Sequence, residues 1–201
     1  MFDIPHRFTA SAVWMPQFFK GRSLADRVGS NWQLSTIVSA QAGRPFSVWC
    51  SASFQAGCDF NADGGGAQFG GSYDRPDAPA PGAIKSSFGK QDYLNGLFNP
   101  NLFPRPTPGT EGTLGRNTFR GPHQISVDIA VERSFRVRES KELKLRFEAF
   151  NALNNVNLYL PNSDMALALL PDGSFSATSS FGVSTQAFDQ RILQVSARFA
   201  F

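Results

Sequence analysis

Hydrophobic and polar residues alternate along three segments in the C-terminal part of the chain. In the last segment the apolar side chains occupy every second position: Leu193, Val195, Ala197, Phe199 and Phe201. Successive side chains of a β-strand point to opposite faces, so this period of two is typical of a strand with one apolar and one polar face. The pattern predicts strands over about 123–136, 141–153 and 190–201.

Two further alternating segments, over about 5–16 and 31–49, bring the number of predicted strands to five. The connections between the five strands are uneven, because long loops over about 51–122 and 154–189 fall on alternate connections. In an up-and-down antiparallel sheet, both loops would leave the same end. Short turns at one end and long loops at the other are typical of an outer-membrane β-barrel. The predicted fold class is therefore all-β, an antiparallel up-and-down meander of about five strands that forms a segment of a transmembrane β-barrel with long extracellular loops.

Alternation alone does not separate such a barrel from a soluble β-sandwich, in which the apolar face packs a core. In a barrel the apolar face meets lipid and the polar face lines the lumen. Trp14 and Trp32 lie near the same short connection, as the interfacial aromatic residues of a membrane barrel do. A last strand that ends on an aromatic residue, Phe201, also favours the barrel. A soluble sandwich that binds a ligand or partner through its long loops is the alternative, and a composite barrel of several copies is a third hypothesis.

Composition restricts the classes further. The chain has 201 residues, of which 20 are Phe and only 17% are charged, and its mean hydropathy is −0.22. It holds no run of about 20 apolar residues, the length that a membrane-spanning helix needs. The net charge of +3 is not gathered into a basic run, so nucleic acid is not an expected partner. Alternation accounts for many of the aromatic residues, but not for four in the long loop: Phe54, Phe60, Phe69 and Phe88.

Several motifs resemble a known family. The stretch 115–122, the stretch 147–155 and the last strand resemble the C-terminal end of TonB-dependent outer-membrane receptors. The resemblance is closest to the Oar-like group, whose members often carry a carboxypeptidase-regulatory-like domain. Residues 3–8, 32–35 and 42–46 resemble upstream strand motifs of the same group, in the family's order.

The resemblance implies a barrel of about 22 strands with a plug domain, located in a Gram-negative type of cell outer membrane, of which this chain is roughly a quarter. We expect residues 1–201 to be a partial, C-terminal barrel without plug, TonB box or signal peptide, so that solute transport belongs to the full-length protein. The expected partners are outer-membrane lipid, the rest of the barrel and its plug, and the barrel-assembly machinery. The family's assembly signal corresponds here to Phe201, Phe199, Ala197, Val195 and Leu193.

The first long loop contains a candidate metal site. Asp59, Asn61 and Asp63 fit the opening D-x-N-x-D-G of a calcium loop, whose carboxylate and amide oxygens suit a hard cation. Gly70 stands where the twelfth residue of an EF-hand loop would be a bidentate Glu. The alternative is an Asx-rich turn with no metal. Calcium is the one candidate cofactor.

The same region contains the chain's two cysteines, Cys50 and Cys58. In an oxidising compartment they could form a small disulfide, and the alternative is two free thiols.

No catalytic constellation accompanies these features. His6 and His123 are the only histidines, and neither a nucleophile elbow nor a phosphate-binding loop is present. We therefore predict that the chain is not an enzyme. Asn151, Asn154 and Asn155 follow the fourth predicted strand, where we expect their amides to satisfy backbone groups of a turn.

Overall fold

The computed structural model describes residues 3–16, 29–51, 57–63, 73–138 and 141–201. The chain divides into two compact units. The loop unit comprises Met1–Ile4, Gly43–His123 and Leu158–Ala187, and the strand unit comprises Pro5–Ala42, Gln124–Asn157 and Phe188–Phe201. Within the described residues, no helix is both long enough and apolar enough to span a membrane.

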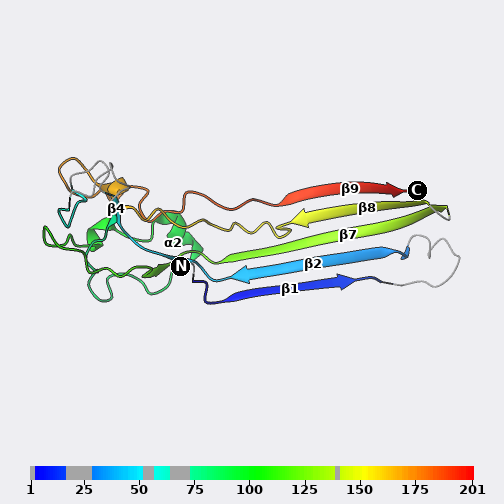
Figure 1. The fold of residues 1–201 in the computed structure, drawn as a ribbon, viewed down its shortest axis with the longest axis horizontal. Coiled ribbons are helices and arrows are strands. Elements are labelled where there is room, and N and C mark those ends of the chain that lie inside the picture. Colours follow the sequence, from blue (N-terminus) through cyan, green and yellow to red (C-terminus); the bar gives the residue numbers. More distant parts are fainter. Residues whose placement is uncertain (1–2, 17–28, 52–56, 64–72, 139–140) are drawn as a thin grey trace. The chain divides into compact units, whose positions relative to one another are not determined.

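The strand unit is a five-stranded antiparallel sheet in which every long strand pairs with the next long strand along the chain (Figure 1). This arrangement confirms the predicted all-β meander. The strands follow one another in this order: β1 (Arg7–Trp14), β2 (Trp32–Gln41), β7 (Gln124–Arg138), β8 (Lys141–Phe150) and β9 (Ile192–Ala200).

The strand register gathers the alternating apolar residues on one face. Val131 of β7 lies opposite Leu34 of β2 on one side and Phe147 of β8 on the other. Phe147 in turn lies opposite Val195 of β9. Because directly opposed residues share a face, these pairs form a continuous apolar row across the sheet. We call this surface the apolar face.

The intervening positions form the polar face, which carries paired charges. Glu132 of β7 lies opposite Arg146 of β8. The Arg146 guanidinium lies 3.5 Å from the Glu132 carboxylate and 2.8 Å from that of Glu148. Lys144 and Glu142 form a looser pair at 3.9 Å. Opposite charges at neighbouring positions reduce mutual repulsion along this face.

Four of the five predicted strands are shorter in the structure than the sequence predicts, and the reason is clear for two of them. The segment predicted as a strand over 31–49 leaves the sheet after Gln41. A side chain at Gly43 would bring its Cβ within 1.8 Å of the Gly121 carbonyl oxygen, so these two backbones touch. The segment predicted as a strand over 141–153 ends at Phe150, because Asn151 adopts a positive φ of 48° that a strand does not contain.

The loop unit contains short regular elements in the two regions where the sequence predicts only long loops. It contains these short elements: β3 (Pro45–Phe46) paired with β6 (Phe119–Arg120), β4 (Cys50–Ser51) paired with β5 (Tyr73–Asp74), α2 (Lys90–Asn95), and the 3-10 turns η1 (Pro100–Leu102) and η2 (Met165–Ala168). The β3–β6 pair joins two of the motifs that resemble TonB-dependent receptors.

An aromatic cluster forms the core of the loop unit. The Phe98 ring lies at its centre, with centroid distances of 4.6 to 6.3 Å to its neighbours Phe46, Phe88, Phe103, Phe119 and Phe181. Phe60 is buried in the same core and Phe88 packs against it, which accounts for two of the four loop phenylalanines that alternation left unexplained. Phe54 and Phe69 lie outside the described residues.

Two further interactions tie the loop unit together. Cys50 and Cys58 form a disulfide, and both residues are fully buried. The Tyr93 hydroxyl donates a hydrogen bond of 2.9 Å to the Arg120 carbonyl oxygen. Burial raises the pKa of the Tyr93 hydroxyl to about 12, so this donor keeps its proton across the physiological range.

Candidate functional site

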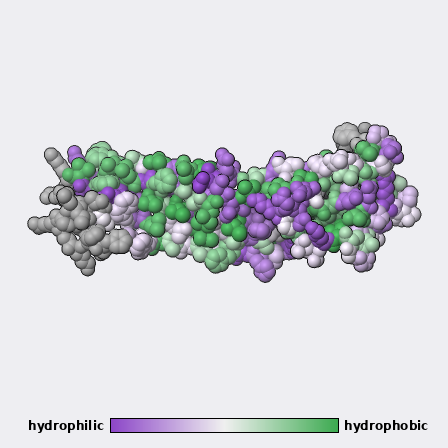
Figure 2. Space-filling view, turned by 180° about the vertical axis from the view of Figure 1, so that it is seen from behind, coloured by the Kyte–Doolittle hydropathy of each residue, from purple (hydrophilic) through white to green (hydrophobic). Residues whose placement is uncertain are grey.

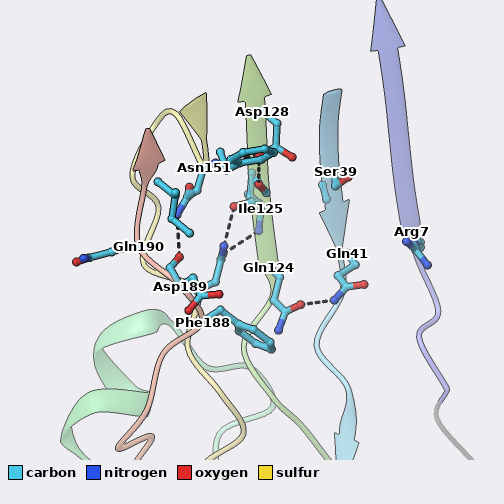
Figure 3. A pocket seen from close by; sticks show the side chains of 15 residues that line it. Arg7, Ser39, Gln41, Gln124, Ile125, Asp128, Asn151, Phe188, Asp189 and Gln190 are labelled. Carbon is cyan, nitrogen blue, oxygen red and sulfur yellow. Dashed lines mark hydrogen bonds between the residues drawn. The ribbon is translucent and has the colours of Figure 1, made fainter. Parts of the chain in front are cut away.

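The polar face of the strand unit is hollowed where the sheet meets its long connections. β1 begins here, β2 ends here and β7 begins here, and the hollow has a volume of about 390 Å³ (Figure 3). We call it the amide hollow, because uncharged amide side chains are prominent in its lining. The strand residues on its wall include Arg7, Ser39, Gln41, Gln124, Ser126 and Asp128. The remaining wall comes from residues that follow β8 and precede β9.

Asn157 fixes one wall of the hollow to β7. Its side chain carbonyl accepts a hydrogen bond of 2.9 Å from the Ile125 N–H, and its amide donates one of 2.9 Å to the Ile125 carbonyl. The Phe188 N–H donates to the Asn157 carbonyl at 2.8 Å. Asn157 thus pairs with β7 as a neighbouring strand would, and it holds Phe188 at the hollow.

Asn151 closes the turn after β8. Its N–H donates to the Asp128 carboxylate at 2.8 Å. Its side chain donates to the Asn155 carbonyl at 2.9 Å and accepts from the Asn155 N–H at 3.0 Å. The side-chain carbonyl oxygen of Asn154 accepts a hydrogen bond of 3.2 Å from the Arg191 N–H. The amides of this motif therefore satisfy turn backbone groups, as the sequence predicts, and connect β8 to the start of β9.

The middle of the hollow is occupied by a pair of amides from neighbouring strands. Gln41 lies opposite Gln124, and its side-chain amide donates a hydrogen bond to the Gln124 side-chain carbonyl. Figure 3 shows this pair between Arg7 on one side and Asp189 on the other. Uncharged groups that both donate and accept hydrogen bonds can hold a small polar ligand without requiring it to carry a charge.

A second hollow of about 290 Å³ lies on the same face toward the other end of the strands. Its lining includes Glu132, Arg136 and Glu142, so charged residues make up a larger share of its lining than of the lining of the amide hollow. Neither hollow was predicted from the sequence, although Gln and Ser residues cluster at the loop ends of β2 and β7, which was a usable signal for the amide hollow.

The residues proposed for calcium lie in the loop unit, where Asn61 and Asp63 are hydrogen-bonded to each other. The Asn61 side-chain amide donates to the Asp63 carboxylate at 2.9 Å and to that of Glu111 at 3.1 Å, and the Asp63 N–H donates to the Asn61 carbonyl at 3.1 Å. One buried Asp59 oxygen has no hydrogen-bond partner in the described part of the chain. No three acidic, His or Cys residues in the same part are grouped to hold a metal. The calcium site stays a prediction.

The residues of the predicted assembly signal lie on the apolar face and its continuation beyond β9, and their large side chains are exposed. Val195 is 76% exposed and Phe201 92%. Exposed apolar residues also occur on the other strands, for example Phe8 on β1, Ile125 on β7 and Phe147 on β8. Figure 2 shows hydrophobic residues gathered over the strands. Such a wide apolar surface indicates an interaction with an apolar environment.

The meander, its two faces and its exposed apolar side define a sheet of the kind that forms membrane barrels. A family model described as an outer membrane beta barrel domain matches residues 1–194. The chain belongs to this family, and the family implies an outer-membrane location. No curated protein matches the chain, and no solved structure matches it.

Proposed function

We propose that the chain is the C-terminal β-barrel segment of a TonB-dependent outer-membrane transporter and that solute transport belongs to the full-length protein. The observation that carries the proposal is the exposed apolar face of the five-stranded sheet. Family membership supports the barrel, and the motifs that resemble TonB-dependent receptors of the Oar-like group support the transporter.

The exposure of the apolar face argues against the soluble alternative. A β-sandwich buries its apolar face against a second sheet, whereas here Phe8, Val195 and Phe199 are more than half exposed. The loop unit of the same chain buries its own phenylalanines. The apolar face of the sheet is therefore suited to contact with lipid. The polar face, with Arg146, Glu132 and Glu148, would then line the interior of the barrel.

The two edges of the sheet support a larger barrel. Within the described sheet, β1 and β9 each pair with one strand, and unpaired edge groups are not stable in a bilayer. A transmembrane barrel usually needs at least about eight strands to close. Further strands of a longer protein would pair with these edges. β9, with its alternating apolar side chains, is the proposed recognition element for the barrel-assembly machinery.

Membrane dependence is the first test of the proposal. The full chain is produced and purified in buffers with and without detergent, and its oligomeric state in each buffer is measured by light scattering. We expect it to need detergent for recovery as a monodisperse species. A soluble monomer with a cooperative unfolding transition in plain buffer would contradict the barrel and restore the sandwich.

Transport needs a separate test on the complete gene product. The coding sequence in frame with residues 1–201 is expected to encode a plug domain and more alternating strands. Dissipating the proton gradient is then expected to stop uptake by cells that carry this product, since TonB-dependent transport is energised from the inner membrane. Uptake that continues without the gradient would contradict TonB dependence and leave the barrel assignment intact.

A further inference from the structure

We propose that the amide hollow binds a neutral polyhydroxylated solute of the size of a mono- or disaccharide. The inference deepens the proposed function, because it names a class of solute for the passage that the polar face would line, and it rests on that function. Its basis is the size of the hollow, its rigid wall, its charge balance and its pairing of amides with an aromatic ring.

The hollow has the dimensions and rigidity of a small-ligand site. Its volume of about 390 Å³ lies toward the lower end of the roughly 300–1,000 Å³ that is usual for such sites. Asn157 and Asn151 hold its walls through six hydrogen bonds, three at each residue, with lengths of 2.8 to 3.0 Å. A wall that is already ordered lowers the entropic cost of binding.

The charges around the hollow favour a neutral ligand. Asp128 is tied into the wall, because its carboxylate accepts hydrogen bonds from the Asn151 N–H at 2.8 Å and the Ser126 hydroxyl at 3.1 Å. Arg7 and Asp189, of opposite sign, lie on opposite sides of the hollow (Figure 3). A charged ligand in the hollow would be attracted by one of these two side chains and repelled by the other. The repulsion would offset part of the attraction, so a net charge on the ligand would add little to its affinity.

The amide pair complements hydroxyl groups. The bond from Gln41 to Gln124 uses one hydrogen of the Gln41 amide and the carbonyl oxygen of Gln124. It leaves the amide hydrogens of Gln124 as donors and the carbonyl oxygen of Gln41 as an acceptor. A sugar hydroxyl donates and accepts at the same oxygen, so adjacent hydroxyls can bond to both glutamines.

An aromatic ring completes the match. Figure 3 places the Phe188 side chain beside Gln124, and the ring lines the hollow together with Phe150 and Ile192. The face of an aromatic ring is electron-rich and attracts C–H groups. A sugar ring carries C–H groups on its faces and hydroxyls on its rim, so it can pack on Phe188 while it bonds to the amides.

The test measures binding of named sugars to the full chain in a detergent that has no sugar headgroup. Glucose, maltose and cellobiose are the probes, with citrate and a lysine dipeptide as charged comparators. Saturation-transfer NMR and calorimetry are performed after circular dichroism has shown a β-sheet spectrum. We expect at least one sugar to bind, and Gln124→Leu to lower its affinity by about tenfold, since it removes a hydrogen-bonding group and leaves Gln41 unpaired.

Gln194→Leu is the matched control, because Gln194 lies on the polar face of β9 opposite Glu148 and does not line the hollow. We expect it to leave sugar binding unchanged. Phe188→Leu provides a second variant in case Gln124→Leu does not fold. It keeps an apolar side chain but removes the aromatic face, and we expect it to weaken sugar binding as well.

Three results would overturn the inference: no sugar binding by the folded chain, tighter binding of citrate or the dipeptide than of every sugar, or sugar binding that is unchanged in both hollow variants. The proposed function is judged separately, by the requirement for detergent. A chain that needs detergent but binds no sugar would refute this inference alone, whereas a soluble monomer would refute the proposed function.

Discussion

The loop unit and the strand unit use the same residue type in opposite ways. Phe98 in the loop unit is 7% exposed and is surrounded by other aromatic rings, whereas Phe199 on β9 is 51% exposed. The loop unit is thus organised like a water-soluble domain with an internal core. The strand unit is organised for surroundings that are themselves apolar. The buried Phe98 and the exposed Phe199 can therefore be compared directly within one chain.

Alternation of apolar and polar residues along a strand defines an apolar face, but it does not define whether water, protein or lipid contacts that face. A large apolar side chain gains roughly 1.5–3 kcal/mol when it is removed from water. The loop unit obtains this gain from its own residues. The strand unit would obtain it from lipid, so equivalent substitutions in the loop core and on the apolar face are expected to differ in their effects.

The largest expected effect comes from removing the central ring of the loop unit. Phe98→Ala is expected to destabilise this unit by about 3–5 kcal/mol, since it opens a cavity among five rings. The matched control is Phe8→Ala on the apolar face of β1, where the side chain is 60% exposed. Guanidinium unfolding in detergent, followed by near-ultraviolet circular dichroism and limited proteolysis, measures both. Equal effects of the two changes on the loop unit would contradict the contrast.

A charge placed on each face of β9 gives the next largest effect. Val195→Arg would put a guanidinium on the apolar face, at an expected cost of about 2–4 kcal/mol if that position lies near the middle of the bilayer. Ser196→Arg, on the polar face opposite Arg146, is expected to cost less, although it adds a like charge. Recovery of the folded protein in lipid vesicles measures the two variants. Equal yields of folded protein for Val195→Arg and Ser196→Arg would contradict contact between lipid and the apolar face.

The sequence predicted the strand unit well for a physical reason. Val127 and Ile129 alternate with Ser126 and Asp128 because the two faces of the strand meet different environments. Neighbouring residues in the sequence therefore show the pattern directly. The ends of the strands depend on less local facts. β2 ends before Gly43 because the backbone there touches Gly121, a residue far away in the sequence.

The loop unit could not be predicted in the same way. Phe46, Phe98 and Phe181 meet in one core although they are widely separated in the sequence, and the short elements around them have no periodicity. The amide hollow escaped prediction for a similar reason, since Gln41 and Gln124 become neighbours only through the pairing of β2 with β7. The role of Asn151 in a turn was predictable because its partners Asn154 and Asn155 are close in sequence.

The disulfide tests whether the loop unit depends on an oxidising environment. Reduction of the Cys50–Cys58 bond is expected to lower the free energy of unfolding of the loop unit by about 2.5 kcal/mol, the chain-entropy value for a loop of this length. Unfolding with and without dithiothreitol measures the effect, and a Cys50→Ala/Cys58→Ala variant controls for other actions of the reagent. Alkylation of both thiols in the unreduced, denatured protein would show that the bond is absent.

The smallest effect concerns the turn that joins β8 to the amide hollow. Asn151→Ala is expected to cost about 1–3 kcal/mol, because it removes two side-chain hydrogen bonds to Asn155 and leaves its partly buried backbone N–H and carbonyl without these partners. It also places a residue with a Cβ at a positive φ of 48°. Asn151→Gly loses the same side chain but tolerates this φ, so it is expected to cost less than Ala by about 1 kcal/mol. Denaturant unfolding of the strand unit in detergent distinguishes the two, and equal losses would show that the side-chain bonds alone hold the turn.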